Sequence, residues 1–173
     1  MEEIITLRAV LGATKSVASY SPCKTYRYSL TRTWSSGNPK LLYLLLNPST
    51  ATETKNDPTV VRCQIRAYKL GYQSFRVCNL FAFRSTSPST LKDCVDPIGP
   101  LNDQVIKRSI TWADKIICAW GANGALLDRD TEIKSVLKKM GKEYLHLGLT
   151  KDNHPMHPLY VPYSRKIVSY TPN

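Results

Sequence analysis

Short apolar stretches alternate with amphipathic stretches along most of the chain. Tyr26, Tyr28 and Leu30 alternate with polar residues, a period of two that predicts a strand. The apolar run 40–46 is typical of a strand that is buried on both faces. Further strands are predicted at 74–79, 115–120 and 143–147.

Helical periodicity follows these strands in turn. Asp57-Pro58 has the form of an N-cap followed by proline at the first helical position, so a helix is predicted over 59–70, ending at Gly71. The same reasoning predicts helices over 101–112 and 126–140.

This order of strands and helices is the pattern of an α/β protein. We expect a central, mostly parallel sheet. Residues 1–22 show no clear period and are expected to form an N-terminal strand or loose extension, whereas 23–173 form a single α/β domain. In open parallel sheets, ligands bind at the carboxyl ends of the strands. Those ends are expected at 47–50, 79–81, 120–123 and 148–160.

The charge of the chain bears on its function, because the chain is strongly basic. Its 173 residues contain 24 Lys and Arg against 13 Asp and Glu, a formal net charge of +11. Residues 1–86 carry 12 basic and 4 acidic residues, and 87–173 carry 12 and 9. Such a balance is typical of nucleic-acid-binding domains, although a solvated basic surface would give the same count.

The sequence argues against several other classes of protein. The five cysteines are odd in number and contain no C-x-x-C pair, so neither a disulfide framework nor a metal site is predicted. The P-loop, the G-x-G-x-x-G fingerprint and the G-x-S-x-G elbow are all absent. No cofactor is therefore expected. No apolar run is long enough for a membrane span, and the N-terminus does not have the pattern of a secretory signal.

Four polar residues near the predicted strand ends are candidates for chemistry. Asn47 follows a predicted strand and Asn79 ends one, and an amide at either place can orient water or read the polar edge of a base. His154 and His157 are each followed by proline and can donate a hydrogen bond or relay a proton. The alternative is a turn for each asparagine and a loop contact for each histidine; function is favoured for His157, and the two interpretations are level for His154.

Basic residues on the helix predicted over 59–70 share one face. Arg62, Arg66 and Lys69 have the spacing i, i+4 and i+7, so they can follow a row of phosphates. A solvated helix face is the equally weighted alternative.

Several motifs together resemble domain-of-unknown-function family 1643, from about Tyr26 to Tyr160. The resemblance is carried by segments that are well separated in the sequence: Leu45-Leu46-Asn47-Pro48-Ser49-Thr50-Ala51, Asp57-Pro58-Thr59 with Arg62, Asn79-Leu80-Phe81-Ala82, Ala119-Trp120-Gly121, Leu147-Gly148-Leu149-Thr150-Lys151-Asp152 and His157-Pro158-Leu159-Tyr160.

The order of these motifs also resembles, more distantly, the uracil-DNA glycosylase superfamily. The fold of that superfamily is a three-layer α/β/α sandwich around a four-stranded parallel sheet, so the resemblance implies this architecture, with a central, mostly parallel four-stranded sheet. Asn47-Pro48 matches the motif after the first strand, Asn79 matches the base-reading asparagine, and His157-Pro158-Leu159 matches the last motif. Ser49 stands where a glycine often lies, and the aspartate-containing water motif and the iron–sulfur cysteines of two branches are missing. Uracil itself is therefore not the expected substrate.

The resemblance implies a role for each matching residue in the release of a flipped base. Asn47 would hold water and His157 would stabilise the departing base, so these two are the expected catalytic residues. The expected substrate-binding residues are Pro48, Ser49, Asn79, Phe81, His154, Leu159 and Tyr160, with Phe83 as an alternative stacking residue, and the expected phosphate contacts are Arg62, Arg66, Arg84 and Lys151.

The function expected first is therefore hydrolysis of the N-glycosidic bond of a flipped, possibly modified base, on DNA rather than RNA. The two alternatives are a non-catalytic module that binds nucleic acid or a modified base, and an enzyme that acts on a small nucleoside or nucleotide. A cytoplasmic protein of bacterial or phage origin is expected, with its cysteines reduced.

Overall fold

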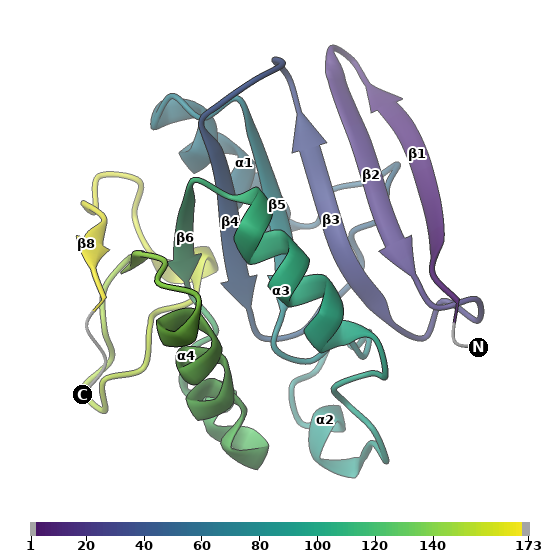
Figure 1. Cartoon of the computed structure of the whole chain (residues 1–173), viewed down its shortest axis with the longest axis vertical. Coiled ribbons are helices and arrows are strands. Elements are labelled where there is room, and N and C mark those ends of the chain that lie inside the picture. Colours follow the sequence, from purple (N-terminus) through teal and green to yellow (C-terminus); the bar gives the residue numbers. More distant parts are fainter. Residues whose placement is uncertain (1–2, 171–173) are drawn as a thin grey trace.

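A single mixed sheet of eight strands runs through the molecule, with helices on both of its faces (Figure 1). The computed structural model describes residues 3–170. The strand order is β1-β2-β3-β5-β4-β6-β7-β8. The strands are β1 Ile5–Leu11, β2 Thr14–Tyr20, β3 Arg27–Thr33, β4 Lys40–Leu45, β5 Ser74–Asn79, β6 Lys115–Cys118, β7 Tyr144–His146 and β8 Val168–Ser169. The helices are α1 Pro58–Lys69, α2 Thr90–Asp93, α3 Asn102–Trp112 and α4 Arg129–Lys139, with short 3₁₀ segments η1 Ala122–Asp128 and η2 Pro158–Tyr160.

The predicted α/β class is confirmed, but the sheet is larger than expected. Strands β5, β4, β6 and β7 pair in parallel, while β1, β2 and β3 pair antiparallel and join through β3 to β5. Residues 1–22, expected as a loose extension, supply β1 and β2, which form a hairpin around Gly12. Along β1, half-buried Ile5, Leu7 and Ala9 alternate with exposed residues, so the alternation that marks a strand was present in the sequence.

The two faces of the sheet carry two separate apolar cores. Leu42, Leu44 and Ile116 pack with Ile106 and Ile110 of α3 and with Ile133 and Leu137 of α4. On the opposite face, the apolar side chains Leu41, Tyr43 and Leu45 pack against α1 through Val60, Cys63 and Ala67. The alternation of β4 side chains between these cores explains why its sequence is apolar throughout, since neither face is exposed to water.

The third predicted helix is shorter than expected. The pattern predicted one helix over 126–140, whereas the chain first forms η1 and enters α4 only at Arg129. Leu127 and Asp128 have φ angles of 55° and 54°, a left-handed conformation that interrupts the helix. The other predicted helices and strands agree with the structure to within about three residues at each end.

Candidate functional site

A cavity of ≈ 450 Å³ opens at the carboxyl ends of the parallel strands. It is closed by the segment after β4, the first turn of α1, the start of the long connection after β5, the turn after β6 and the loop that contains η2. Its lining residues are Leu46, Asn47, Ser49, Thr50, Asp57, Pro58, Thr59, Ser85, Thr86, Pro88, Trp120, Gly121, Ala122, Asn123, His157, Leu159 and Tyr160.

Asn47 enters this cavity in a defined orientation. Its Nδ2 donates hydrogen bonds to the carbonyl oxygens of Ser85 (2.9 Å) and Pro48 (3.2 Å). The opposite orientation of the amide would place Oδ1 against both carbonyl oxygens, so these hydrogen bonds determine which terminal atom of Asn47 is nitrogen and which is oxygen. Within residues 3–170, no protein group donates to Oδ1 of Asn47, and this oxygen is therefore free to accept a hydrogen bond from water or a ligand.

His157 lies at the N-cap of η2 and also lines the cavity. Its Nδ1 accepts a hydrogen bond from the backbone N–H of Leu159 at 3.4 Å. Burial lowers the pKa of His157 below its ordinary value, and the negative charge of Asp57 opposes this effect without cancelling it. The neutral imidazole therefore carries its proton on Nε2, where it can donate a hydrogen bond.

Asp57 is a cavity residue that the sequence indicated only as a helix cap. Its Oδ1 accepts from the backbone N–H of Val60 at 2.8 Å, and its Oδ2 accepts from that of Ala51 at 3.3 Å. The carboxylate thus caps α1 and fixes the loop from Asn47 to Asp57 at the same time. Its presence in the lining adds one negative charge to the cavity, which the D-P dipeptide alone does not reveal.

Two buried arginines of β3 form hydrogen bonds to the loop between Asn47 and Asp57. Arg27 donates to the carbonyl oxygen of Ala51 (2.8 Å), and burial lowers the pKa of its guanidinium to about 10. Arg32 donates to the carbonyl oxygen of Thr52 (2.7 Å) and to Oδ1 of Asn56 (2.8 Å). The antiparallel part of the sheet therefore positions Asn47 and Asp57, although it lies outside the expected four-stranded sheet.

Trp120 provides an apolar wall of the cavity and carries an unused donor. The side chain is 1% exposed, and its Nε1 has no hydrogen-bond partner. A Cβ atom at Gly124 would clash with the indole ring, so glycine is needed there for the ring to pack as it does. The sequence placed Trp120 in a family motif at an expected strand end, but assigned the side chain no role in a site.

The loop that carries His157 is fixed to α1 by the two arginines that were expected to contact phosphates. Arg62 donates to the carbonyl oxygens of Pro158 (3.2 Å) and Val161 (3.2 Å). Arg66 is 4% exposed and donates to those of Val161 (3.1 Å) and Pro162 (3.0 Å). In the structure both side chains hold the loop in place, and Arg66 is covered by it.

Several other expected residues lie outside the cavity. Phe81 is fully buried in the core beside α3, where it cannot stack on a ligand in the cavity. His154 lies in the turn after β7 and Lys151 is exposed on that turn, and neither lines the cavity. Pro48 is buried next to it. Of the expected set, the structure brings together Asn47, Ser49, His157, Leu159 and Tyr160.

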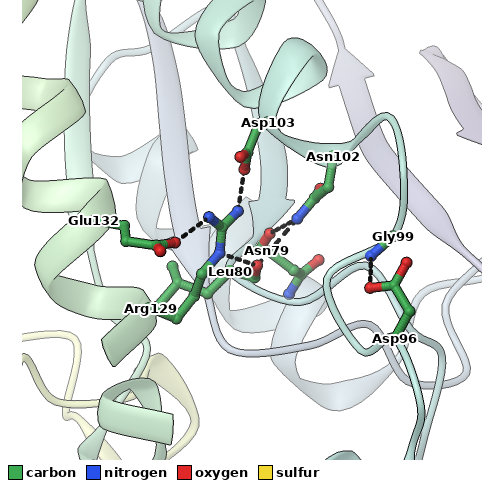
Figure 2. Close-up of polar contacts among 8 residues, drawn as sticks. All are labelled: Asn79, Leu80, Asp96, Gly99, Asn102, Asp103, Arg129 and Glu132. Carbon is green, nitrogen blue, oxygen red and sulfur yellow. Dashed lines mark hydrogen bonds and ion pairs between the residues drawn. The ribbon is translucent and has the colours of Figure 1, made fainter. Parts of the chain in front are cut away.

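Asn79 also lies outside the cavity, in a buried polar cluster at the end of β5 (Figure 2). Its side chain is 2% exposed and its Oδ1 has no partner. Asn102 donates to the backbone carbonyl oxygens of Asn79 (2.9 Å) and Leu80 (3.0 Å), and Arg129 donates to that of Leu80 (2.9 Å). Arg129 is paired with Asp103 and Glu132. The cluster fixes the end of β5 rather than presenting Asn79 to the cavity.

A second, more open hollow of ≈ 690 Å³ adjoins the cavity. The two share Ser49, Thr50, Ser85 and Thr86 as a common rim. Arg84 lines this second hollow together with Lys24 and Cys23, and no acidic side chain does so. Phe83 lines it as well. Arg84 is therefore an expected phosphate contact that lines the hollow adjoining the cavity.

Comparison with known families matches residues 27–159 to the model described as "Protein of unknown function (DUF1643)". The match covers more than half of the chain. The chain belongs to the DUF1643 family. The expected membership is thus confirmed, and the motifs that carried it include four of the segments around the cavity. Comparisons with curated proteins and with solved structures found no match for this DUF1643 chain.

Two further features bear on the class of site in this DUF1643 protein. Within residues 3–170, no group of three or more His, Cys, Asp or Glu side chains is arranged to hold a metal ion. In the same part of the chain, no helix has the length and apolar character needed to cross a membrane. The five cysteines are free thiols, and Cys63, Cys78 and Cys118 are buried.

Proposed function

We propose that this protein hydrolyses the N-glycosidic bond of a base that has been flipped out of a nucleic-acid strand, with DNA as the favoured strand. The observation that carries the proposal is the pair of polar groups, Asn47 and His157, that line the same cavity. Asn47 offers a fixed, free acceptor oxygen, and His157 is a neutral imidazole with a proton on Nε2. The parallel strands β5, β4, β6 and β7, with helices on both faces of the sheet, support the proposed likeness to the uracil-DNA glycosylase superfamily.

The two groups fit the charges that develop when such a bond breaks. Cleavage leaves negative charge on the departing base and positive charge on the sugar. A hydrogen bond from Nε2 of His157 would stabilise the base, and Oδ1 of Asn47 would orient the water that attacks the anomeric carbon. The carboxylate of Asp57, on the same cavity wall as the first turn of α1, would favour the positively charged sugar.

The dimensions and rim of the cavity suit a flipped nucleotide. Its volume of ≈ 450 Å³ falls in the range of small-molecule sites. Leu159 and the 77% exposed Tyr160 line the cavity, where an apolar side chain can fill the gap left in the stack. The net charge of +11 supports a polyanionic substrate.

Release of free base tests this proposal. Duplex and single-stranded DNA that carry normal, deaminated, alkylated and phage-type modified bases would be incubated with the protein, and free base would be measured by mass spectrometry. Asn47→Ala and His157→Ala are each expected to slow release by about 100-fold or more while DNA affinity stays nearly unchanged. Gln104→Ala, which truncates an exposed amide on α3, is the control and should release base at the wild-type rate. Wild-type rates for both cavity variants would contradict the proposal.

A second candidate is a module that reads a modified base without breaking a bond. One observation favours it: the only carboxylate in the lining, that of Asp57, already holds two backbone N–H groups of the protein, those of Ala51 and Val60. Such a module would bind DNA in a salt-dependent manner and release no base from any strand in the same assay.

A further inference from the structure

A hollow of ≈ 530 Å³ lies on the face of the sheet that α3 covers, and it shares no lining residue with the candidate cavity. It is formed where the β1–β2 hairpin extends past α3; Figure 1 shows that no helix covers these two strands on this face. Three arginines line it from three different elements: Arg8 from β1, Arg76 from β5 and Arg108 from α3.

Arg76 lies at the centre of this hollow among neutral partners. Its Nε donates to the hydroxyl of Thr31 at 2.9 Å, and its Nη1 donates to that of Ser109 at 3.2 Å. Its guanidinium carbon lies 4.2 Å from the centre of the Trp112 ring, a stacking contact that holds the group in one orientation. Burial lowers the pKa of Arg76 below its ordinary value, yet the group stays a cation at neutral pH.

No negative charge compensates these three arginines. The lining contains no Asp or Glu, and none of the three forms a salt bridge within residues 3–170. The nearby Cys78 is buried, and burial raises the pKa of its thiol, so it remains neutral. A partly buried cation without a counter-charge is costly, and two further cations of the same sign beside it add repulsion. An anion in the hollow would remove both costs.

The groups that line the hollow indicate the kind of anion. Guanidinium groups present several N–H donors in a fixed plane, which matches the oxygen atoms of a phosphate group. Hydroxyls from Thr31, Ser109 and three other Ser or Thr residues in the lining can donate further hydrogen bonds to such oxygens.

We propose that the hollow between α3 and the β1–β2 hairpin is a phosphate-binding site formed by Arg8, Arg76 and Arg108. The phosphate group belongs either to a small phosphorylated molecule or to the backbone of a nucleic-acid strand. The site is separate from the cavity of the proposed function, and its existence does not depend on whether that cavity breaks a bond.

Calorimetric titration with pyrophosphate at low ionic strength tests the site. We expect wild-type protein to bind pyrophosphate, and we expect the Arg8→Ala/Arg108→Ala double variant to bind it about tenfold more weakly or worse. Both side chains are exposed, so this variant should keep the fold. Lys92→Ala/Lys107→Ala is the matched control: it removes two exposed cations outside the hollow, gives the same net charge and should change the affinity by less than about twofold.

A second titration distinguishes the two sources of the phosphate group. A short single-stranded oligodeoxythymidylate with a 5′-hydroxyl end contains only backbone phosphates. If its affinity falls in the arginine double variant and not in the lysine control, the site takes a strand; if only pyrophosphate responds in this way, it takes a small molecule. Arg76→Gln should weaken whichever probe responds. The proposal is overturned if wild-type protein binds neither probe, or if the arginine and lysine double variants lose affinity equally.

Discussion

Asn102 offers the sharpest test of how the polar cluster supports the end of β5. The side chain is fully buried at the first position of α3, and its Nδ2 donates to two buried backbone carbonyl groups, those of Asn79 and Leu80 (Figure 2). Replacement by alanine removes both hydrogen bonds and leaves space too confined for the carbonyl groups to be solvated freely. We therefore expect Asn102→Ala to destabilise the fold substantially.

The size of this effect follows from the two hydrogen bonds. Each contributes about 0.5–1.5 kcal/mol net, and a buried polar group left without its partner costs about 1–3 kcal/mol. Arg129 still donates to the carbonyl of Leu80 in the variant, so the full penalty applies to fewer than two groups. The expected loss in the free energy of unfolding is about 2–4 kcal/mol, or roughly 4–16 °C in Tm for a chain of this size.

Urea denaturation followed by circular dichroism, with thermal unfolding as a second measurement, gives the comparison. Gln104→Ala removes an amide from the same helix at an exposed position, so its effect should stay within about 0.5 kcal/mol of wild type. The reasoning is refuted if Asn102→Ala loses no more stability than Gln104→Ala does. An unchanged m-value would show that the loss comes from the native state rather than from a change in the unfolded chain.

Three further predictions concern the cavity and its surroundings. Gly124→Ala places a methyl group against the Trp120 ring, so we expect a loss of about 1–3 kcal/mol and an altered tryptophan emission; wild-type stability and emission would contradict this. Neighbouring hydroxyl groups lower the pKa of the exposed Cys23 to about 7, so iodoacetamide should label one thiol rapidly at neutral pH. Cys23→Ser should abolish this fast phase, which Cys94→Ser should retain. Because burial lowers the pKa of His157 in the folded chain, the unfolded chain takes up a proton first as the pH falls below about 6.5. Stability should therefore decrease from pH 7 to pH 5, and an equally steep decrease in His157→Gln would contradict the assignment.

Local features of the sequence determined the elements that surround the cavity. The Asp57-Pro58 pair correctly placed the start of α1, and the apolar run at 40–46 correctly placed β4. Both signals are local. The N-cap requires only a side chain and the backbone N–H three residues later, and the apolar run requires only that the strand is buried on both faces. Because parallel strands place their carboxyl ends at one edge, the segments with Asn47 and His157 were expected together, and both line the cavity.

Tertiary contacts decided what those same signals left open. Arg62 and Arg66 have the spacing of a phosphate-binding face, yet they bind carbonyl groups almost a hundred residues ahead. The helical period of 3.6 residues shows that two side chains share a helix face, but it does not show which part of the protein packs against that face. The same limit explains Phe81 and Asn79, whose positions after β5 were predicted while the burial of their side chains by α3 and its neighbours was not.

The sequence by itself determined the α/β class, most of the element boundaries and the edge of the sheet where a cavity would form, because each depends on the order and periodicity of nearby residues. Only the tertiary structure decided that β3 pairs with β5, that the first hairpin completes the sheet, and that Arg8, Arg76 and Arg108 meet around one hollow. These features depend on pairing between distant segments. Packing and hydrogen bonding across the whole chain select that pairing, so no single segment encodes it.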